Sequence, residues 1–253
     1  MAIGVNSHAE GDSTQARGET SHVEGRSTVA KGDFAHAEGN GSTANGIASH
    51  AENNGRAYGH YSHAEGGSTA RGDHAHAEGS SIADGDYSHA EGGIATASAY
   101  ASHAEGNNTK ASAYASHTEG MYTVANGEYM HAQGQFNKPD DTVWPDWVAN
   151  TAYSIGDQVT YIGIGYTCKT ANSDAEFTYG NWKRESSNGG ENAFVIGNGT
   201  SDTERSNAAA IGWDGTGKYA GDVYANYNFA TKTGEKLATE SFVRELIQQY
   251  LGG

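Results

Sequence analysis

The chain has 253 residues, of which 36 are glycine, 2 are proline and 1 is cysteine. Its 31 acidic and 15 basic side chains give a formal net charge of −16 at pH 7. Such a surface repels nucleic acid and anionic lipid, so we expect no nucleic-acid partner and no membrane insertion. The single Cys168 excludes an intrachain disulfide and fits assembly in a reducing cytoplasm. We find no export signal and no apolar run long enough to span a membrane.

A five-residue phrase repeats through the first half of the chain. It begins as Ser7-His8-Ala9-Glu10-Gly11 and ends, in altered form, as Met130-His131-Ala132-Gln133-Gly134. Its histidines stand at positions 8, 22, 36, 50, 63, 76, 89, 103, 117 and 131, so successive copies are 13 or 14 residues apart. A second phrase, Ser13-Thr14-x-Ala16-x-Gly18, recurs between the copies. A short fixed period of this kind is typical of a solenoid, in which each repeat forms one coil.

The two phrases of each period have the length of short strands closed by glycine turns. Because strand side chains alternate, histidine and glutamate share one face, and alanine points into a narrow lumen. That lumen buries too little apolar surface to offset the conformational entropy of ordering a single chain. We therefore predict an all-β fold, a parallel β-roll that assembles as a homotrimer and buries further surface between chains.

Two later phrases carry a resemblance to a known family. Residues Asn192-Ala193-Phe194-Val195-Ile196-Gly197 and Asn207-Ala208-Ala209-Ala210-Ile211-Gly212 resemble the head repeat of trimeric autotransporter adhesins, which form a trimeric left-handed β-roll. The Ser-His-Ala-Glu-Gly version is similar to repeats in tail-fibre and tail-tip proteins of bacteriophages, prophages and phage-tail-like particles. This resemblance covers about residues 6–134 and 189–230. It implies a fibre protein of the virion tail that contacts other tail or baseplate proteins.

Composition changes sharply after the last repeat, where aromatic residues and both prolines are concentrated. We predict four parts: β-roll repeats at 1–135, an inserted module at 136–187, a roll continuation and distal β region at 188–235, and a trimerising helix at 236–253. Within the continuation we expect two more coils, at 192–199 and 207–215. The final helix has Thr239 as its cap and an apolar face at Val243, Leu246, Ile247 and Tyr250. The alternative is a helix that docks on its own chain.

The inserted segment has its own pattern of aromatic residues. The spacing of Trp147, Tyr153, Val159, Tyr166 and Trp182 resembles that of small chitin- and cellulose-binding modules, which are compact three-stranded β domains. The resemblance implies that these five side chains are mainly core, with turns at residues 156–157 and 163. The paired aromatics that follow the last tyrosine in that family are replaced here by residues 168–172, so the match to chitin or cellulose is incomplete.

We expect sugar recognition by aromatics outside this core set, because pyranose rings stack on exposed aromatic faces and their hydroxyls bind polar neighbours. The candidates are Trp144, Tyr161, Phe177, Tyr179, Asn172 and Asp174. The alternative is that the segment is a spacer whose aromatics serve packing alone.

The repeated histidines and glutamates predict no enzyme, because catalysis requires one site that differs from the rest. Their expected role is a structural ladder of hydrogen bonds. One local exception is His74 and His76, whose spacing places two imidazoles on one strand face. Around a three-fold axis this pair suits iron, nickel or zinc, and some trimeric phage fibres hold iron through a similar motif. We expect no other cofactor, and the alternative is two plain surface or ladder histidines.

The sequence thus predicts a non-catalytic tail fibre or receptor-binding protein that adheres to host cell-wall polysaccharide or teichoic acid. The alternatives are the head fragment of a cell-surface adhesin, a purely structural spacer, a polysaccharide depolymerase with its carboxylates between chains, and an ice-binding solenoid. The last rests on a column of threonines: Thr14, Thr28, Thr43, Thr69, Thr109 and Thr123.

Overall fold

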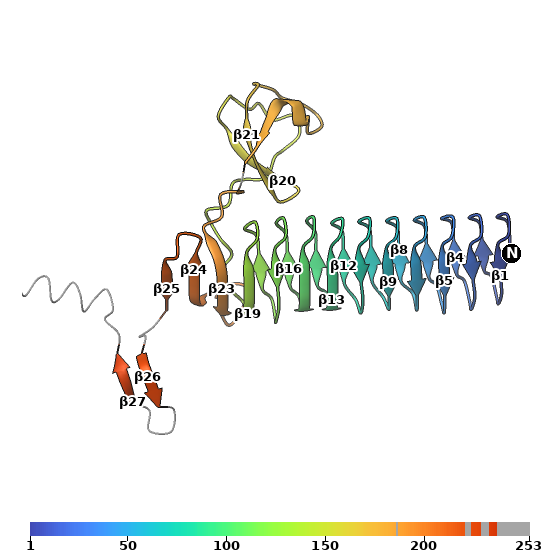
Figure 1. The fold of residues 1–253 in the computed structure, drawn as a ribbon, viewed down its shortest axis with the longest axis horizontal. Helices are drawn as coiled ribbons and strands as arrows, with labels where there is room; N and C mark the ends of the chain where they lie inside the picture. Colours follow the sequence, from blue (N-terminus) through green and yellow to red (C-terminus); the bar gives the residue numbers. More distant parts are fainter. Residues whose placement is uncertain (186, 221–223, 229–232, 237–253) are drawn as a thin grey trace, which may run out of the picture.

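The computed structural model describes residues 1–185, 187–220, 224–228 and 233–236. These residues form an all-β architecture in which a β-solenoid of about nine turns is the largest part. Figure 1 shows the coils in a straight row that begins at the N-terminus, with the β20–β22 sheet beside the far end of the row. Among the described residues the helical content is one short 3-10 turn, η1 (Tyr179–Asn181). The prediction of an all-β solenoid is confirmed.

Two sheets line the solenoid, and each coil from β1 to β18 contributes one strand to each sheet, in parallel with its neighbours. The histidine sheet contains β1 (His8–Ala9), β3 (His22–Val23), β5 (His36–Glu38), β7 (His50–Glu52), β9 (His63–Glu65), β11 (His76–Ala77), β13 (His89–Gly93), β15 (His103–Asn107), β17 (His117–Thr118), β19 (His131–Gln135), β23 (Asn192–Asn198), β24 (Asn207–Gly212) and β25 (Gly217–Tyr219). The second sheet contains β2 (Gln15–Ala16), β4 (Val29–Ala30), β6 (Thr43–Ala44), β8 (Arg56–Ala57), β10 (Thr69–Ala70), β12 (Ile82–Ala83), β14 (Thr96–Ala97), β16 (Lys110–Ala111) and β18 (Val124–Ala125).

The lumen of the roll is filled almost entirely by alanine. Every repeat coil pairs in register with the next, His8 with His22 for example, so the lumen residues, nearly all of them alanine, stack on one another along the rod. These alanines are fully buried, while the histidines beside them are half-buried on the outer face. The predicted alternation is therefore confirmed. Two larger side chains, Val23 and Thr118, take the place of alanine without becoming exposed.

Glycine is required where neighbouring coils approach most closely. A Cβ atom on Gly18, Gly32 or Gly59 would lie 1.9 Å from the carbonyl oxygen of the equivalent glycine in the following coil. The serine that opens the histidine phrase closes the same turn, as when Ser62 Oγ donates to Gly59 O at 2.7 Å. The glycine thus allows neighbouring coils to approach closely, and the serine stabilises the turn between the two strands.

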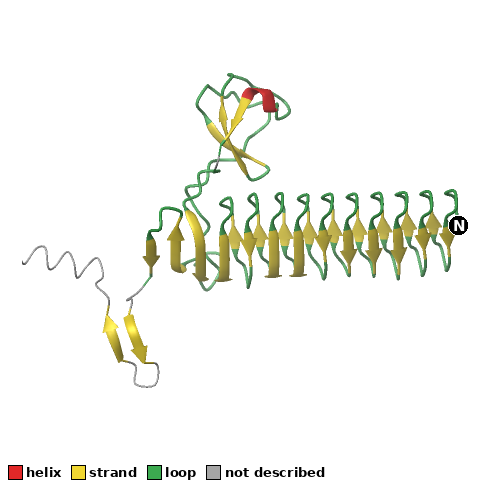
Figure 2. Ribbon diagram, in the orientation of Figure 1, coloured by secondary structure: helices red, strands yellow, loops and turns green. Residues whose placement is uncertain are grey.

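The roll ends differently from the prediction. β23 continues the histidine sheet in parallel with β19, but β24 and β25 follow in antiparallel order, so the second of the two expected coils, at residues 207–215, does not form. The intervening residues 199–206 contain no alanine to fill the lumen, and they fold into a tight turn in which Thr200 N donates to Glu204 O at 3.1 Å. The chain therefore reverses (Figure 2).

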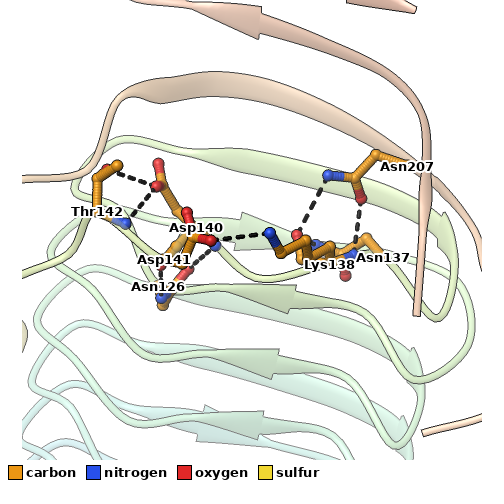
Figure 3. Close-up of polar contacts among 7 residues, drawn as sticks. All are labelled: Asn126, Asn137, Lys138, Asp140, Asp141, Thr142 and Asn207. Carbon is orange, nitrogen blue, oxygen red and sulfur yellow. Dashed lines mark hydrogen bonds and ion pairs between the residues drawn. The ribbon is translucent and has the colours of Figure 1, made fainter. Parts of the chain in front are cut away.

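Asparagine side chains form hydrogen bonds at the end of the second sheet, next to its last strand (Figure 3). Asn137, which is fully buried, accepts from Val124 N at 2.7 Å and donates to Val124 O at 2.9 Å, as a further strand would. Asn126 exchanges two hydrogen bonds with the backbone of Asp140. Asn207 likewise contacts the backbone of Lys138. Asn137 thus satisfies backbone groups that the edge of β18 would otherwise leave open, and the other two asparagines hold the segment that follows Asn137.

A three-stranded antiparallel sheet, β20 (Gln158–Tyr161), β21 (Ile164–Cys168) and β22 (Trp182–Arg184), forms between β19 and β23. Its core is Val159, Tyr166, Cys168, Phe177 and Trp182, with Trp147 and Tyr153 packed against it. The five side chains expected to be mainly core thus lie in or against it. Gly156 and Gly163 have positive φ, of 98° and 73°, as the expected turns require.

The end of the described chain is a hairpin of β26 (Tyr224–Asn228) and β27 (Thr233–Lys236). The predicted helix at 236–253 lies almost wholly outside the described residues. Within the part of the chain that the structure describes, no helix has the length and apolar character needed to cross a membrane.

Candidate functional site

A groove lies where the three-stranded sheet meets the roll. It has a volume of about 640 Å³, within the range of ordinary ligand sites. One wall comes from coils of the roll and carries Lys110, Ser112 and Asn126. The other wall comes from the segment that leads into β20 and from the β20–β21 turn, and its aromatic side chains are Trp144, Trp147 and Tyr161. The groove therefore combines aromatic surface on one side with polar groups on the other.

Hydrogen bonds fix the two walls relative to each other. Glu128, 3% exposed in the roll, accepts a hydrogen bond from Gly165 N in β21 at 2.8 Å. Asn188 donates to Asn126 O at 2.8 Å, and its own oxygen accepts from Glu128 N at 3.2 Å. The guanidinium of Arg184 lies 5.1 Å above the ring of Tyr114. Because side chains from both parts take part, the groove is a preformed feature of the fold.

Burial has an electrostatic cost at this junction. Removal from water raises the pKa of Glu128, while the hydrogen bond from Gly165 and the charge of Arg184 act in the opposite direction. Burial also raises the pKa of the Tyr166 hydroxyl nearby. The Glu128 carboxylate is held in place by the contacts that join the sheet to the roll.

Two of the six sugar-binding candidates lie in the groove. Trp144 is half-buried, and its backbone N donates to Asn188 O at 2.9 Å. Tyr161 is also half-buried and lies edge-on to Trp147, with ring centroids 5.7 Å apart. Trp147 was assigned to the core by the sequence, yet it also lines the groove beside these two residues.

The other four candidates lie outside the groove. Phe177 is 8% exposed and belongs to the core, where it stacks on Tyr161 at 4.0 Å, so the expectation that it stands apart from the core is wrong. Tyr179 is 60% exposed and contacts Phe177 edge-on. Asn172 pairs with the backbone of Tyr153, and Asp174 accepts from Asn181 Nδ2 at 2.9 Å. The two polar residues are therefore engaged in holding the sheet's loops.

The roll side of the groove could not be assigned from sequence. Lys110, Ser112 and Asn126 stand in ordinary positions of the repeat, and nothing in the repeat marks them as different from their counterparts in other coils. They become part of a site only because the later segment folds back on these coils. The available signal was the aromatic cluster at 144–147, which indicates one wall alone.

His74 and His76 do not share a strand face. His74 occupies a turn with a φ of 58° and stacks between Tyr61 and Tyr87, with ring centroids 4.9 and 4.7 Å away. His76 belongs to β11 and stacks between His63 and His89. The two imidazoles thus belong to different columns, because residue 74 precedes the strand in the left-handed backbone region. The premise that one strand places both on the same face is wrong.

The histidines of the repeat form a continuous stack on the outer face of the roll. Neighbouring ring centroids are 4.5 to 5.1 Å apart from His8 to His131. Several contact glutamates, such as His63 with Glu52 at 3.3 Å. Burial, followed by the charge of neighbouring histidines, lowers the pKa of His103 and of His131.

The threonines named from the sequence do not line up on one exposed face of the roll. Strand pairing aligns Thr43 with Val29, so Thr43 does not follow Thr28 along the rod. Thr14, Thr28, Thr109 and Thr123 are buried beneath the turns. The exposed threonine array that ice binding would need does not form at these positions.

No protein-family model matches the chain, and no curated protein matches it in sequence.

Proposed function

We propose that the chain is a segment of a homotrimeric fibre, from a phage or phage-tail-like particle, that adheres to polysaccharide on the bacterial surface without cleaving it. The observation that carries this proposal is the groove beside the roll. Three aromatic side chains, Trp144, Trp147 and Tyr161, face polar groups of the roll across about 640 Å³. Sugars are recognised by this combination, since their C–H faces stack on aromatic rings and their hydroxyls need hydrogen-bond partners.

The charge of the protein favours a neutral glycan over teichoic acid. The net charge is −16, and the groove holds Asp140 and Asp146 against a single cation, Lys110. A polymer with one phosphate per repeat would be repelled over most of this surface. A neutral cell-wall polysaccharide meets no such barrier and gains the same aromatic contacts.

The composition of the core supports a trimer. The lumen of the roll is lined by alanine, the smallest apolar side chain with a Cβ, and large aromatics stand exposed along the turns. Phe34, Tyr61 and Tyr87 are 61%, 59% and 55% exposed. Burial of these rings against another chain would add apolar contact that the single roll lacks. Three grooves on one rod would then strengthen weak individual contacts through avidity.

The experiment is a sedimentation assay of the full chain with purified Gram-positive cell walls, before and after chemical removal of teichoic acid. We expect binding that persists after the removal. Trp144→Ala should weaken binding by about tenfold, the loss of one stacked aromatic contact. Lys110→Ala tests the opposite wall and should also weaken binding, because the residue lines the groove from the roll side.

Tyr179→Ala is the matched control, because it removes a 60% exposed aromatic outside the groove. If Tyr179→Ala lowers binding and Trp144→Ala does not, the groove is not the site. If neither wall preparation binds, the structural spacer is the better proposal. Light scattering tests assembly separately, with an expected mass near three times 26.4 kDa.

A further inference from the structure

The outer face of the roll carries a column of carboxylates with few cations near it. Glutamate follows every repeat histidine except His131 by two residues and so lies on the same face, as in Glu105 beside His103 and Glu119 beside His117. Like charges stacked at the spacing of strands repel one another unless something neutralises them. Among the described residues, the ion-pair partners found for these glutamates are histidines, as in the contact of His131 Nε2 with Glu119 Oε1 at 3.8 Å.

The imidazoles facing this column have unused ligand atoms. The Nε2 atoms of His103, His117 and His131 are shielded from solvent and have no hydrogen-bond partner within the described structure. The same holds for His76 and His89, so five consecutive coils carry such an atom. A buried polar atom without a partner costs free energy, so these nitrogens require an explanation. Nitrogen of imidazole next to carboxylate oxygen is a donor set that transition metals prefer and that magnesium and calcium do not.

Among the described residues, four groups along the roll bring three possible ligand atoms together, and the last of them stands at the end of the column. His117, Glu119 and His131 each offer one ligand atom, and these three atoms lie within 4.8 Å of one another. All three side chains are half-buried. A tetrahedral zinc site requires its ligand atoms to be about 3.3 Å apart, since each bond is about 2.0–2.1 Å long. The difference is small enough for side-chain rotation, with no movement of the strands.

The stacking of the two rings also differs here from that of the other neighbouring repeat histidines, whose ring planes are 1° to 18° apart. The planes of His36 and His50 are 1° apart, and parallel rings direct their lone pairs along parallel lines. The planes of His117 and His131 are 24° apart, and such a departure from parallel is needed before two rings can share one ion. Beyond His131 the column stops, because Phe194 stands edge-on to it at the next position, with ring centroids 5.2 Å apart.

We propose that His117, Glu119 and His131 form a binding site for a divalent transition-metal ion of the zinc class, with solvent as the fourth ligand. The ion would satisfy the orphaned nitrogens and neutralise part of the carboxylate column. The site is distinct from the groove and from the His74–His76 pair, and it requires neither the glycan nor the trimer.

The test is titration of the chelator-treated full chain with Zn²⁺ by calorimetry at pH 7, and with Co²⁺ by visible absorption. We expect bound zinc and the strong absorption bands of tetrahedral Co²⁺. Glu119→Gln keeps the shape of the side chain but removes its charge, and it should weaken this site by about tenfold or more, as even outer-shell changes do. His131→Gln removes one nitrogen ligand and should abolish the cobalt bands from this site.

Glu78→Gln is the matched control, because it changes the same position of a coil that does not bring such a trio of ligand atoms together. It should leave the zinc affinity and the cobalt spectrum unchanged. Circular dichroism of each variant reports whether the roll is intact. The proposal is overturned if no tetrahedral cobalt spectrum develops, or if Glu119→Gln binds zinc as tightly as the unchanged chain, which would mean non-specific binding along the histidine stack.

Discussion

The substitution Gly59→Ala tests whether close contact between coils holds the rod together. Gly59 N and Tyr58 N donate to Ala70 O of the next coil at 3.4 and 2.8 Å. An added Cβ would lie 1.9 Å from Gly72 O, whereas ordinary contact begins near 3.4 Å, so the coils would have to separate by about 1.5 Å. Both hydrogen bonds would then exceed bonding distance. Leaving their groups unpaired costs about 1–3 kcal/mol each, or about 2–6 kcal/mol together.

The assay is unfolding by guanidinium, followed by circular dichroism, with the free energy of unfolding compared between variants. Gly180→Ala is the control, because no atom lies within 4 Å of a Cβ at that position. It should change stability by well under the Gly59→Ala effect. Equal unfolding free energies for the two variants would refute the argument that coil contact requires glycine at position 59.

Two further predictions concern buried polar groups. Ser62→Ala removes a 2.7 Å hydrogen bond to Gly59 O and should lower the free energy of unfolding by about 1 kcal/mol. The buried hydroxyl of Ser88 has no partner within the described structure, so Ser88→Ala should be neutral or stabilising. Thermal unfolding of both variants checks this difference. Glu128→Gln should make the protein more stable at pH 7. The raised pKa of Glu128 means that its contribution is fully present below its unfolded pKa and is lost as the pH rises through the folded value. The difference in stability between Glu128→Gln and the unchanged chain should therefore grow as the pH rises from about 4 to 7. If the difference in their unfolding midpoints stays constant over that range, the destabilising effect of the Glu128 charge is contradicted.

Much of the roll followed from the sequence because each coil repeats the same local constraints. Alternation placed alanine in the lumen and histidine outside, and the glycine spacing fixed the turns. The prediction of a second coil at residues 207–215 was wrong for a local reason. Asn207–Gly212 looks like a repeat strand, but residues 199–206 before it form a turn that reverses the chain. A turn that cannot fill the lumen ends a solenoid even when the next strand fits its pattern.

The groove was less predictable because it is made by two distant parts of the chain. The aromatic pattern indicated Trp144 and Tyr161, but Lys110 and Asn126 gained their place only through the docking of β21 against Glu128. His74 was misplaced for a related reason. Spacing of two residues implies a shared face only inside a strand, and residue 74 lies in the turn before β11 begins.

Asn137 caps the edge strand of the second sheet, and its removal should destabilise only the neighbouring coils. Asn137→Ala would leave both Val124 N and Val124 O unpaired at the open edge of β18, where they now bond the buried amide at 2.7 and 2.9 Å. The expected cost is about 1–3 kcal/mol for each group. Because stability in a solenoid passes between nearest neighbours, the loss should increase hydrogen exchange in β18 and β16 and leave the coils near the N-terminus protected. Asn207→Ala is the control, since its contacts with Lys138 lie at the surface and leave the edge of β18 covered. Faster exchange along the entire rod would instead mean that the roll opens as one cooperative unit, and the nearest-neighbour argument would fail.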